Sequence, residues 1–457
     1  MTDHAENGRI ERSTPQSNDV NSPDGDATGM NGRAERSDGR APSANGRAEG
    51  VGAQVENPAG QAENANDRPG SQTVRAMEPT DRAKSAAAGS PPLHVHRLRV
   101  KAAAGDYDVV IGSHLLAAAD RFFEGVASAD AAVLIIFDEA LATAGYPQTL
   151  QTALSQRFSS IHAVALPTGE TSKSLLQAER LYAECLAAGL DRKSVIVALG
   201  GGVVGDAAGF VAATFMRGIR FVQVPTTLLA HDASIGGKVA INLPQGKNLV
   251  GAFHPPRLVL YDVETLRTLP SAERSSGLAE AIKHGIIRDP GLFEFIAAHA
   301  EALLEGDPSL TAELLARSCQ VKADIVSLDE RESGLRAILN LGHTVGHAVE
   351  ALAYGAYSHG AAVAMGMVCE TRIAVRLGLA QPELVSTIQQ LLARVRLPSD
   401  LPNSLKNAAA IDELIAHMRL DKKAIARSLP FVLPESLGSV RFMPAVSEQI
   451  VMEALAD

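Results

Sequence analysis

Residues 194–210, SVIVALGGGVVGDAAGF, decide the fold class of this chain. They join an apolar, β-branched run typical of a buried strand to a glycine-rich turn and then to a helix-like run. Gly200, Gly202 and Gly205 satisfy the spacing G-x-G-x-x-G. Such glycines permit a tight turn, and the following helix offers free N–H groups and a positive dipole end to a pyrophosphate. The stretch therefore favours a dinucleotide-binding unit, with a sharp turn that binds nothing as the alternative.

The segments around this unit alternate between strand-like and helix-like patterns. Strand-like runs occupy residues 131–139, 161–167, 220–227 and 257–263, and a helix-like run occupies 173–188. Strands separated by helices predict a layered, largely parallel α/β sheet. After Pro270 the β-branched runs give way to Ala, Leu, Glu, Lys and Arg at helical spacing. We therefore predict an α/β domain over residues 91–270 and an all-α domain over 271–457.

The first 90 residues differ from the rest in composition. They contain no Phe, Tyr, Trp or Leu, and Asn-Gly-Arg-Ala-Glu occurs twice, beginning at Asn31 and Asn45. Such a segment cannot bury enough apolar surface to offset the entropy lost on ordering. We predict a disordered tail over residues 1–90.

Charge and cysteine usage exclude several classes of partner. The formal net charge is -10, from 52 acidic and 42 basic residues, without the basic block that a phosphate backbone requires, so we predict no nucleic-acid partner. Cys185, Cys319 and Cys369 are odd in number and far apart, which favours core thiols in a reducing cytoplasm over a disulfide framework. No apolar run has the length of a membrane-spanning helix, so we predict a cytoplasmic protein without a membrane partner.

Cationic residues gather in residues 216–253, MRGIRFVQVPTTLLAHDASIGGKVAINLPQGKNLVGAF. Lys238 and Lys247 each follow a glycine in this loop-like segment, close in sequence to Asn242 and Asn248. A chain of negative net charge needs local cations to bind an anionic substrate. Glycine and asparagine suit tight turns that bring backbone donors near a ligand. The pattern favours an anion site over solvated surface lysines.

A second polar set lies in the predicted helical half. Residues 339–350, LNLGHTVGHAVE, place His343 and His347 four residues apart, while Glu280 lies in GLAEAIKHG and His359 in YSHGAA. Imidazoles with a carboxylate are the ligands of an open catalytic zinc site or a non-haem iron site. Spacing alone favours His343 and His347 as a pair on one helical face. The residues therefore predict a metal site.

An acid that holds the ribose of a dinucleotide normally ends the strand after the glycine turn. Here that strand ends in Pro225, Thr226 and Thr227. Asp138, at the end of the earlier strand-like run AAVLIIFDE, is the better candidate. We therefore expect the cofactor to lie across a strand order that differs from the usual one.

Taken together, the motifs resemble the 3-dehydroquinate synthase family of sugar phosphate cyclases. The resemblance runs from about residue 93 to 452, through GGGVVGD, FVAATFMRGIRFVQVPTTLLA, GGKVAIN, GKNLVGAFHPP, GLAEAIKHG, LNLGHTVGHAVE and DKK. It implies an NAD-binding α/β domain, a helical domain and an active site between them. The implied reaction converts 3-deoxy-D-arabino-heptulosonate 7-phosphate to 3-dehydroquinate and phosphate, with transient use of NAD. It also implies a divalent metal, zinc or else cobalt, and a homodimer.

The resemblance also implies residue roles. Glu280, His343 and His359 would be the metal ligands. The residues expected around NAD are Asp138, Glu170, Lys173, Gly202, Val203, Val204, Gly205, Asp206, Thr226, Thr227, Asp232, Lys238, Lys247 and Thr268. The residues expected around the substrate are Arg217, Asp232, Lys238, Lys247, Asn248, Lys283, Lys322, Arg336, Asn340, His347 and Lys422, with Lys423 as the alternative to the last.

Three details depart from the commoner family pattern. The segment LLAHDASIGGK is one residue shorter than LLA-x-x-D-S-S-x-GGK, although the spacing from Asp232 to Lys238 is kept. Thr168 stands where aspartate is usual, which weakens the expected NAD contacts of the loop that follows it. His284 stands where tyrosine is frequent, and the sequence assigns it no role.

Rival functions share parts of this pattern. Other sugar phosphate cyclases, such as 2-deoxy-scyllo-inosose synthase or the valiolone synthases, share fold, NAD and metal, but their substrates lack a carboxylate. Arg336 and Lys322 supply donors for that group, although an amino analogue of the heptulosonate stays open. Iron-containing alcohol or glycerol dehydrogenases perform net redox chemistry and typically use aspartate where this chain has Glu280. A non-catalytic scaffold is disfavoured, because no matched active-site position is lost.

Overall fold

The computed structural model describes residues 94–353, 355–421 and 428–457. The disorder predicted for residues 1–90 and the substrate role predicted for Lys422 lie outside the described residues. None of the described helices is long and apolar enough to cross a lipid bilayer.

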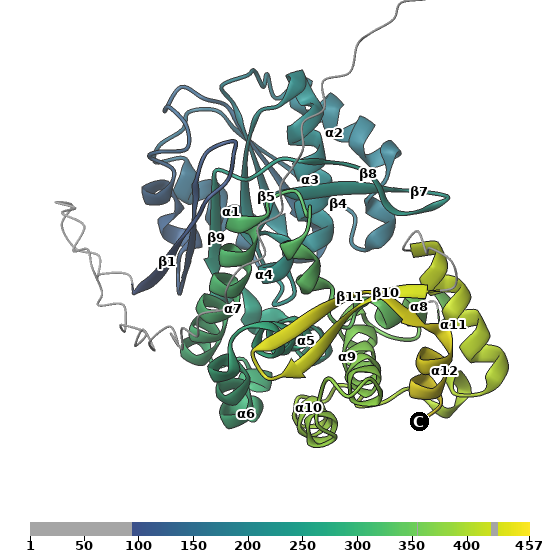
Figure 1. The fold of residues 1–457 in the computed structure, drawn as a ribbon. Coiled ribbons are helices and arrows are strands. Elements are labelled where there is room, and N and C mark those ends of the chain that lie inside the picture. The colour runs from purple at the N-terminus through teal and green to yellow at the C-terminus, as the bar shows by residue number, and fades with distance from the viewer. Residues whose placement is uncertain (1–93, 354, 422–427) are drawn as a thin grey trace, which may run out of the picture. The chain divides into compact units, whose positions relative to one another are not determined.

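A seven-stranded sheet forms the first half of the described chain (Figure 1). Its strands, in spatial order, are β1 (Val95–Val100), β2 (Tyr107–Gly112), β9 (Leu258–Asp262), β6 (Arg220–Pro225), β5 (Val195–Gly200), β3 (Val133–Asp138) and β4 (Ile161–Leu166). Only the β1–β2 pair is antiparallel within this sheet. The predicted α/β sheet, largely parallel, is thereby confirmed.

Strand β5 is buried on both faces, which explains its unbroken apolar sequence. Alternate side chains point to opposite faces, so Val197 packs with the α1 (Tyr146–Leu154) side, and Ile196 packs with the α2 (Leu175–Ala187) side. Helix α3 (Gly202–Thr214) begins at the second glycine of the motif and covers the same face as α2. The strand–turn–helix unit predicted from residues 194–210 is thus present.

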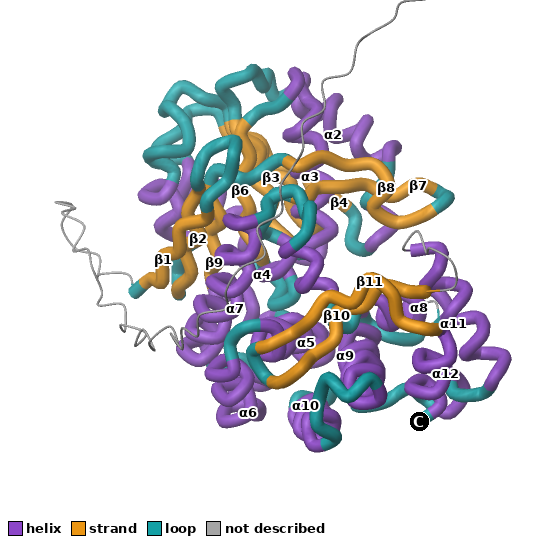
Figure 2. Tube along the Cα trace, viewed as in Figure 1, coloured by secondary structure: helices purple, strands orange, loops and turns teal. Residues whose placement is uncertain are grey.

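The lysine-rich segment forms a hairpin rather than the loop that its glycines suggested. Strand β7 (Lys238–Leu243) pairs antiparallel with β8 (Gly246–Phe253), and both lie beside α3 (Figure 2). The contact with α3 is close, because a side chain at Gly209 of that helix would clash with Val239. Packing of this apolar face gives the segment a strand conformation despite its turn-forming composition.

The second half is mainly helical, as predicted. Its helices are α5 (Ser271–Ile287), α6 (Pro290–Glu305), α7 (Pro308–Leu328), α8 (His343–Leu352), α9 (His359–Arg376), α10 (Glu383–Arg394), α11 (Ala408–Asp421) and α12 (Glu448–Ala456). The prediction of an all-α half needs one correction, since β10 (Ser428–Ser436) and β11 (Ser439–Ser447) form a second hairpin. Its strand pattern is interrupted in the sequence by prolines 430, 434 and 444, and for this reason the hairpin was not predicted.

Shorter helical turns connect these elements. They are α4 (Ala230–Ala233), η1 (Leu116–Phe122), η2 (Glu139–Leu141), η3 (Glu170–Ser172), η4 (Phe215–Arg217), η5 (Val263–Thr268), η6 (Leu335–Asn340) and η7 (Asn403–Leu405).

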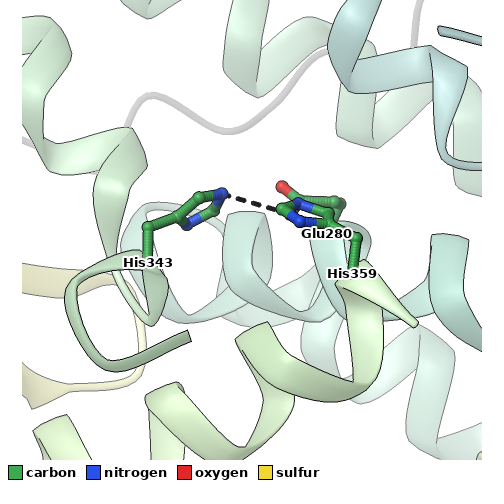
Figure 3. Close-up of side chains that lie close together, drawn as sticks. All are labelled: Glu280, His343 and His359. Atoms are coloured by element: carbon green, nitrogen blue, oxygen red, sulfur yellow. Dashed lines mark ion pairs between the residues drawn. The ribbon is translucent and has the colours of Figure 1, made fainter. Parts of the chain in front are cut away.

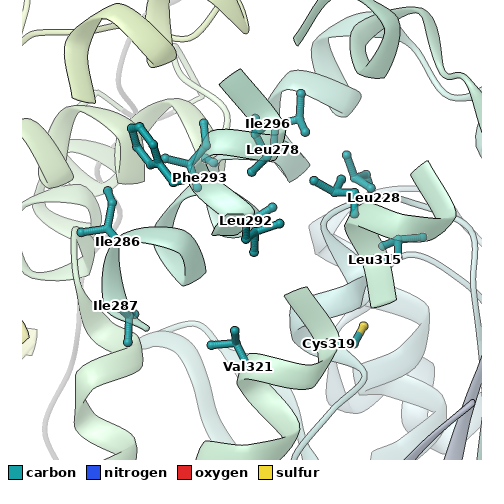
Figure 4. Packing of buried hydrophobic residues seen from close by; sticks show 14 of the residues in the cluster. Leu228, Leu278, Ile286, Ile287, Leu292, Phe293, Ile296, Leu315, Cys319 and Val321 are labelled. Carbon is teal, nitrogen blue, oxygen red and sulfur yellow. The ribbon is translucent and has the colours of Figure 1, made fainter. Parts of the chain in front are cut away.

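Helix α5 is the central support of the second half. Its side chains are buried continuously from Ser275 to Ile287, and its apolar residues pack with Leu228 from the segment after β6 and with Cys319 on α7 (Figure 4). A Cβ at Gly277 would lie 2.6 Å from the Leu228 side chain, so glycine permits this close approach. One apolar core thus includes residues from both sides of residue 270, and the domain boundary placed there stays a prediction.

Candidate active site

Three predicted metal ligands meet at one point (Figure 3). Glu280 comes from α5, while His343 and His359 are the first residues of α8 and α9. Their ligand atoms all lie within 4.8 Å of one another. The Nε2 atoms of His343 and His359 lie 3.6 Å and 3.4 Å from Glu280 Oε1. The structure thus brings together the three ligands expected from the family resemblance.

The chemistry of this cluster fits a divalent cation. Glu280 Oε1 is buried and accepts no hydrogen bond from the described residues, a cost that a bound cation would remove. The Nδ1 atom of His343 lies 3.1 Å from the Leu341 carbonyl oxygen, and that of His359 lies 3.1 Å from Glu350 Oε2. A proton on each Nδ1 leaves the Nε2 lone pairs facing the carboxylate oxygen, which is the tautomer that a metal requires.

His347 borders this cluster without joining it. Its ring centroid lies 5.3 Å from that of His343 and 6.3 Å from that of His359. His347 is absent from the group of converging ligand atoms. The i, i+4 spacing of the two histidines therefore brings His347 to the edge of the site, while the second imidazole of the cluster comes from a separate helix.

Asp232, in α4, is the centre of a neighbouring buried charge cluster. Its carboxylate accepts a 2.7 Å hydrogen bond from Lys322 and lies 3.9 Å from Lys283 Nζ, which also donates to Glu280. Burial alone would raise the pKa of Asp232, but Lys283 and Lys322 hold it well below its usual range. Both lysines are almost completely buried, so their charges are poorly screened by water.

Arg336 is positioned by backbone groups. Its Nη1 donates to the Glu330 carbonyl at 2.5 Å and to the Gly236 carbonyl at 3.3 Å. Gly236 has a φ of 101°, and a Cβ there would clash with Nη2, so this glycine of the GGK motif makes room for the guanidinium. Within the part of the chain that the structure describes, Nη2 donates no hydrogen bond, although Arg336 is only 3% exposed.

Glu332 contacts two of the predicted substrate residues, and the sequence analysis did not predict it as a site residue. Its carboxylate accepts hydrogen bonds from Lys238 and, at 3.0 Å, from Asn340 Nδ2. With a φ of 58°, Glu332 occupies the left-handed region that non-glycine residues rarely adopt. One acid in a polar loop gives no distinguishing sequence signal.

A second missed carboxylate links the β7–β8 hairpin to the metal cluster. Glu350 lies 3.9 Å from Lys247 Nζ through one oxygen and contacts His359 Nδ1 through the other. It ends the LNLGHTVGHAVE motif, two helical turns after His343, but its contacts come from other elements, so the motif alone does not indicate them.

The predicted NAD residues lie mainly at the carboxyl ends of three adjacent strands. Asp138 ends β3, the glycine turn follows β5, and Thr226 and Thr227 follow β6. Ligands of parallel α/β sheets bind at this edge. A Cβ at Gly205 would lie 2.5 Å from Gln223 of β6, so this glycine also serves helix–strand packing.

The loop after β4 completes this edge. Lys173 Nζ donates to Asp206 Oδ2 at 2.7 Å and to Asn248 Oδ1 at 2.5 Å. Glu170 accepts a 2.8 Å hydrogen bond from Asn242. Thr168, which stands where aspartate is usual, donates a hydrogen bond to the Asp138 carboxylate. An aspartate at position 168 would instead bring a second negative charge next to Asp138.

Two predicted residues stand apart from these clusters. Thr268 ends η5, where its hydroxyl bonds the Thr265 carbonyl at 3.1 Å and lies 3.3 Å from the Tyr146 hydroxyl. Arg217 is exposed, with a φ of 69°, and its guanidinium makes no hydrogen bond or ion pair within the described ranges.

Comparisons with known proteins identify the family. Residues 163–276 match the family model of the 3-dehydroquinate synthase N-terminal region, and residues 277–424 match that of its C-terminal region. The 3-dehydroquinate synthase of Symbiobacterium thermophilum is 46% identical over 354 residues, covering 76% of this chain and 98% of the relative. That of a Synechococcus species is 45% identical over 356 residues, covering 76% and 95%.

Solved structures of sugar phosphate cyclases share the fold. A 2-deoxy-scyllo-inosose synthase complexed with carbaglucose-6-phosphate, NAD+ and Co2+ is 26% identical, with a TM-score of 0.71 over 79% of this chain and 99% of that one. A 2-epi-5-epi-valiolone synthase from Streptomyces hygroscopicus, with NAD+ and Zn2+ bound, is 27% identical, with a TM-score of 0.68 over 76% and 95%. From the matched family models and the extent of these identities, the chain belongs to the 3-dehydroquinate synthase family.

Proposed function

We propose that this chain is an NAD- and divalent-metal-dependent 3-dehydroquinate synthase of aromatic biosynthesis. It converts 3-deoxy-D-arabino-heptulosonate 7-phosphate to 3-dehydroquinate and phosphate, in the cytoplasm and as a homodimer. The observation that carries the proposal is the metal cluster next to buried cations, because one site then offers both a metal ion and charges for an anionic substrate.

We assign the metal to the cluster described above. Bound NAD supplies a hydride acceptor, and a metal held by Glu280, His343 and His359 supplies a Lewis acid that eases ionisation of a substrate hydroxyl. Lys283 holds the second oxygen of Glu280, which orients the first toward both imidazoles. His347 lies at the rim of the cluster, where an imidazole can transfer a proton to or from the substrate.

The carboxylate of the substrate distinguishes this function from the other cyclases. Arg336 is buried, held in place through Nη1, and leaves Nη2 for a ligand. Lys322 is a second buried cation, and it contacts Asp232, four residues before Gly236. An arginine fork binds a planar carboxylate through paired hydrogen bonds, and a neutral sugar ring would leave this charge uncompensated.

The test is turnover by the enzyme loaded with NAD and zinc. With the heptulosonate phosphate, we expect stoichiometric release of phosphate and no net change in NADH absorbance. Release of phosphate from a sugar phosphate that lacks a carboxylate, and not from the heptulosonate, would favour another sugar phosphate cyclase. Net reduction of NAD would favour the alcohol dehydrogenase alternative and contradict the proposal.

A further inference from the structure

Two departures from the commoner family pattern meet inside the protein. His231 lies in the shortened segment before Asp232, and His284 replaces the frequent tyrosine. Both side chains are 0% exposed, and their rings pack edge to face with centroids 5.7 Å apart. The Ser318 hydroxyl of α7 lies between them, 2.9 Å from His231 Nε2 and 2.7 Å from His284 Nδ1.

The three side chains connect a backbone carbonyl to the Asp232 carboxylate. His231 Nδ1 lies 2.6 Å from the Leu228 carbonyl oxygen, and His284 Nε2 lies 3.1 Å from Asp232 Oδ1. We call His231, Ser318 and His284 the relay. It makes four hydrogen bonds in series and has an acceptor at each end.

Counting protons along the relay gives a definite result. A carbonyl oxygen and an ionised carboxylate only accept, so each of the four bonds needs a proton from the relay itself. Two neutral imidazoles and one hydroxyl supply three protons. We propose that the relay holds a fourth proton as a His284 imidazolium, which cancels the charge of Asp232 and keeps its carboxylate oriented.

The alternatives leave a buried bond without a proton. A neutral His284 with its proton on Nδ1 would turn a bare Nε2 toward the carboxylate oxygen. With its proton on Nε2, it would have an unprotonated Nδ1 facing the Ser318 oxygen. The Ser318 hydroxyl already donates its proton to His231, so the bond between Ser318 and His284 would have no proton. Buried polar atoms without partners are costly.

Of the two rings, His284 is the one that lies beside a carboxylate, that of Asp232. Burial lowers the pKa of His231 to about 4, which keeps that ring neutral. Burial and the neighbouring Lys283 lower the pKa of His284, whereas Asp232 and Glu280 raise it, and the net shift is downward. The extra proton is therefore required by the hydrogen-bond geometry and not by the surrounding charges. An imidazolium beside a carboxylate forms a buried ion pair in which each charge has a bonded partner.

The relay has a consequence for the substrate site, and this step rests on the proposed function. Asp232 also contacts Lys322 and lies near Lys283. If its charge is cancelled by His284, the charge of Lys322 is left for an anionic ligand. His231, Ser318 and His284 are therefore positioning residues, which act on the substrate through Asp232.

The protonation state can be measured on the wild-type holoenzyme without any activity. In 15N NMR of protein with labelled histidine, loaded with NAD and zinc, we expect both ring nitrogens of His284 to be protonated at neutral pH. His231 should be neutral with its proton on Nδ1. Spectra of His284→Phe and His231→Phe would identify the signals. Two neutral imidazoles would overturn the proposal, whatever reaction the enzyme catalyses.

Variants at the middle of the relay test its link to substrate binding. Ser318→Ala should abolish the imidazolium signal and raise KM for the heptulosonate phosphate about tenfold. Without the imidazolium, Asp232 would neutralise Lys322, and the anionic substrate would lose the attraction of one positive charge. Its kcat should change less, and Ser318→Thr should restore the signal. Ser234→Ala is the matched control, since it removes a buried hydroxyl that has no hydrogen-bond partner among the described residues. An imidazolium that persists in Ser318→Ala, with KM unchanged, would contradict the relay; inactivity of the wild type would contradict only the proposed function.

Discussion

The metal cluster and the cationic residues beside it balance their charges in opposite ways. Glu280 Oε1 accepts no hydrogen bond within the described chain, so a cation can bind there without displacing a donor. By contrast, Lys238 is paired with Glu332, and Lys247 lies near Glu350. A substrate anion must therefore compete with carboxylates of the protein itself. The metal half is organised in advance, whereas the anion half must exchange partners on binding.

The largest effect is expected from removing one metal ligand. His343→Ala should lose metal and activity together, because only two of the three converging ligands remain. His347→Ala should keep about one metal per chain, since the three ligands of an open site are intact. It should lose roughly 100-fold in kcat, as expected for a positioned proton-transfer group. Metal content of both dialysed variants is the measurement, and an equally empty His347→Ala would make the i, i+4 pair the metal site.

Arg336→Met should have the next largest effect. A buried anion would lose its paired donor, which weakens substrate binding about 100-fold while NAD affinity is unchanged. Arg331→Met provides the control, because it removes the same charge from an exposed side chain five residues away. KM for the heptulosonate phosphate and the dissociation constant of NAD separate the two effects. Unchanged kinetics in Arg336→Met would favour a cyclase whose substrate has no carboxylate.

Glu332→Gln tests directly whether a protein carboxylate competes with the substrate. Lys238 is half exposed, so water screens this ion pair and its contribution is small. We expect KM to fall about threefold at low ionic strength, and the difference from wild type to vanish at high salt. A rise in KM would instead show that Glu332 binds the substrate itself, and the two halves of the site would no longer differ as described.

Some parts of the fold and of the site could be predicted from the sequence better than others. Strand β5 and the glycine turn were recognisable because burial on both faces imposes an unbroken apolar run. The metal ligands were recognisable by residue type, but the choice between His347 and His359 depends on how α8 and α9 pack, which spacing does not contain. Glu332 and Glu350 were missed, because a carboxylate that pairs with a lysine across the fold looks like any surface acid.

The smallest effect is expected at an ion pair outside both halves, where charges are balanced without a ligand. Arg372 donates to both oxygens of Asp400 at 2.7 Å and 2.8 Å, and Lys406 donates to the second at 2.9 Å. Although burial alone would raise the pKa of Asp400, Arg372 and Lys406 lower it to about 2.

Because this folded-state pKa lies below the value of about 3.9 for an unfolded chain, the ion pair stabilises the fold above that pH. The stabilisation is lost as the pH falls toward 2. Partial exposure of Asp400 limits its contribution to about 1 kcal/mol. Asp400→Asn should therefore lower the free energy of unfolding at pH 7 by about that amount, and by less at pH 3. Denaturant titrations at both pH values measure this difference, with metal content and KM unchanged; a change in either would show that the metal and anion halves are coupled to distant charges.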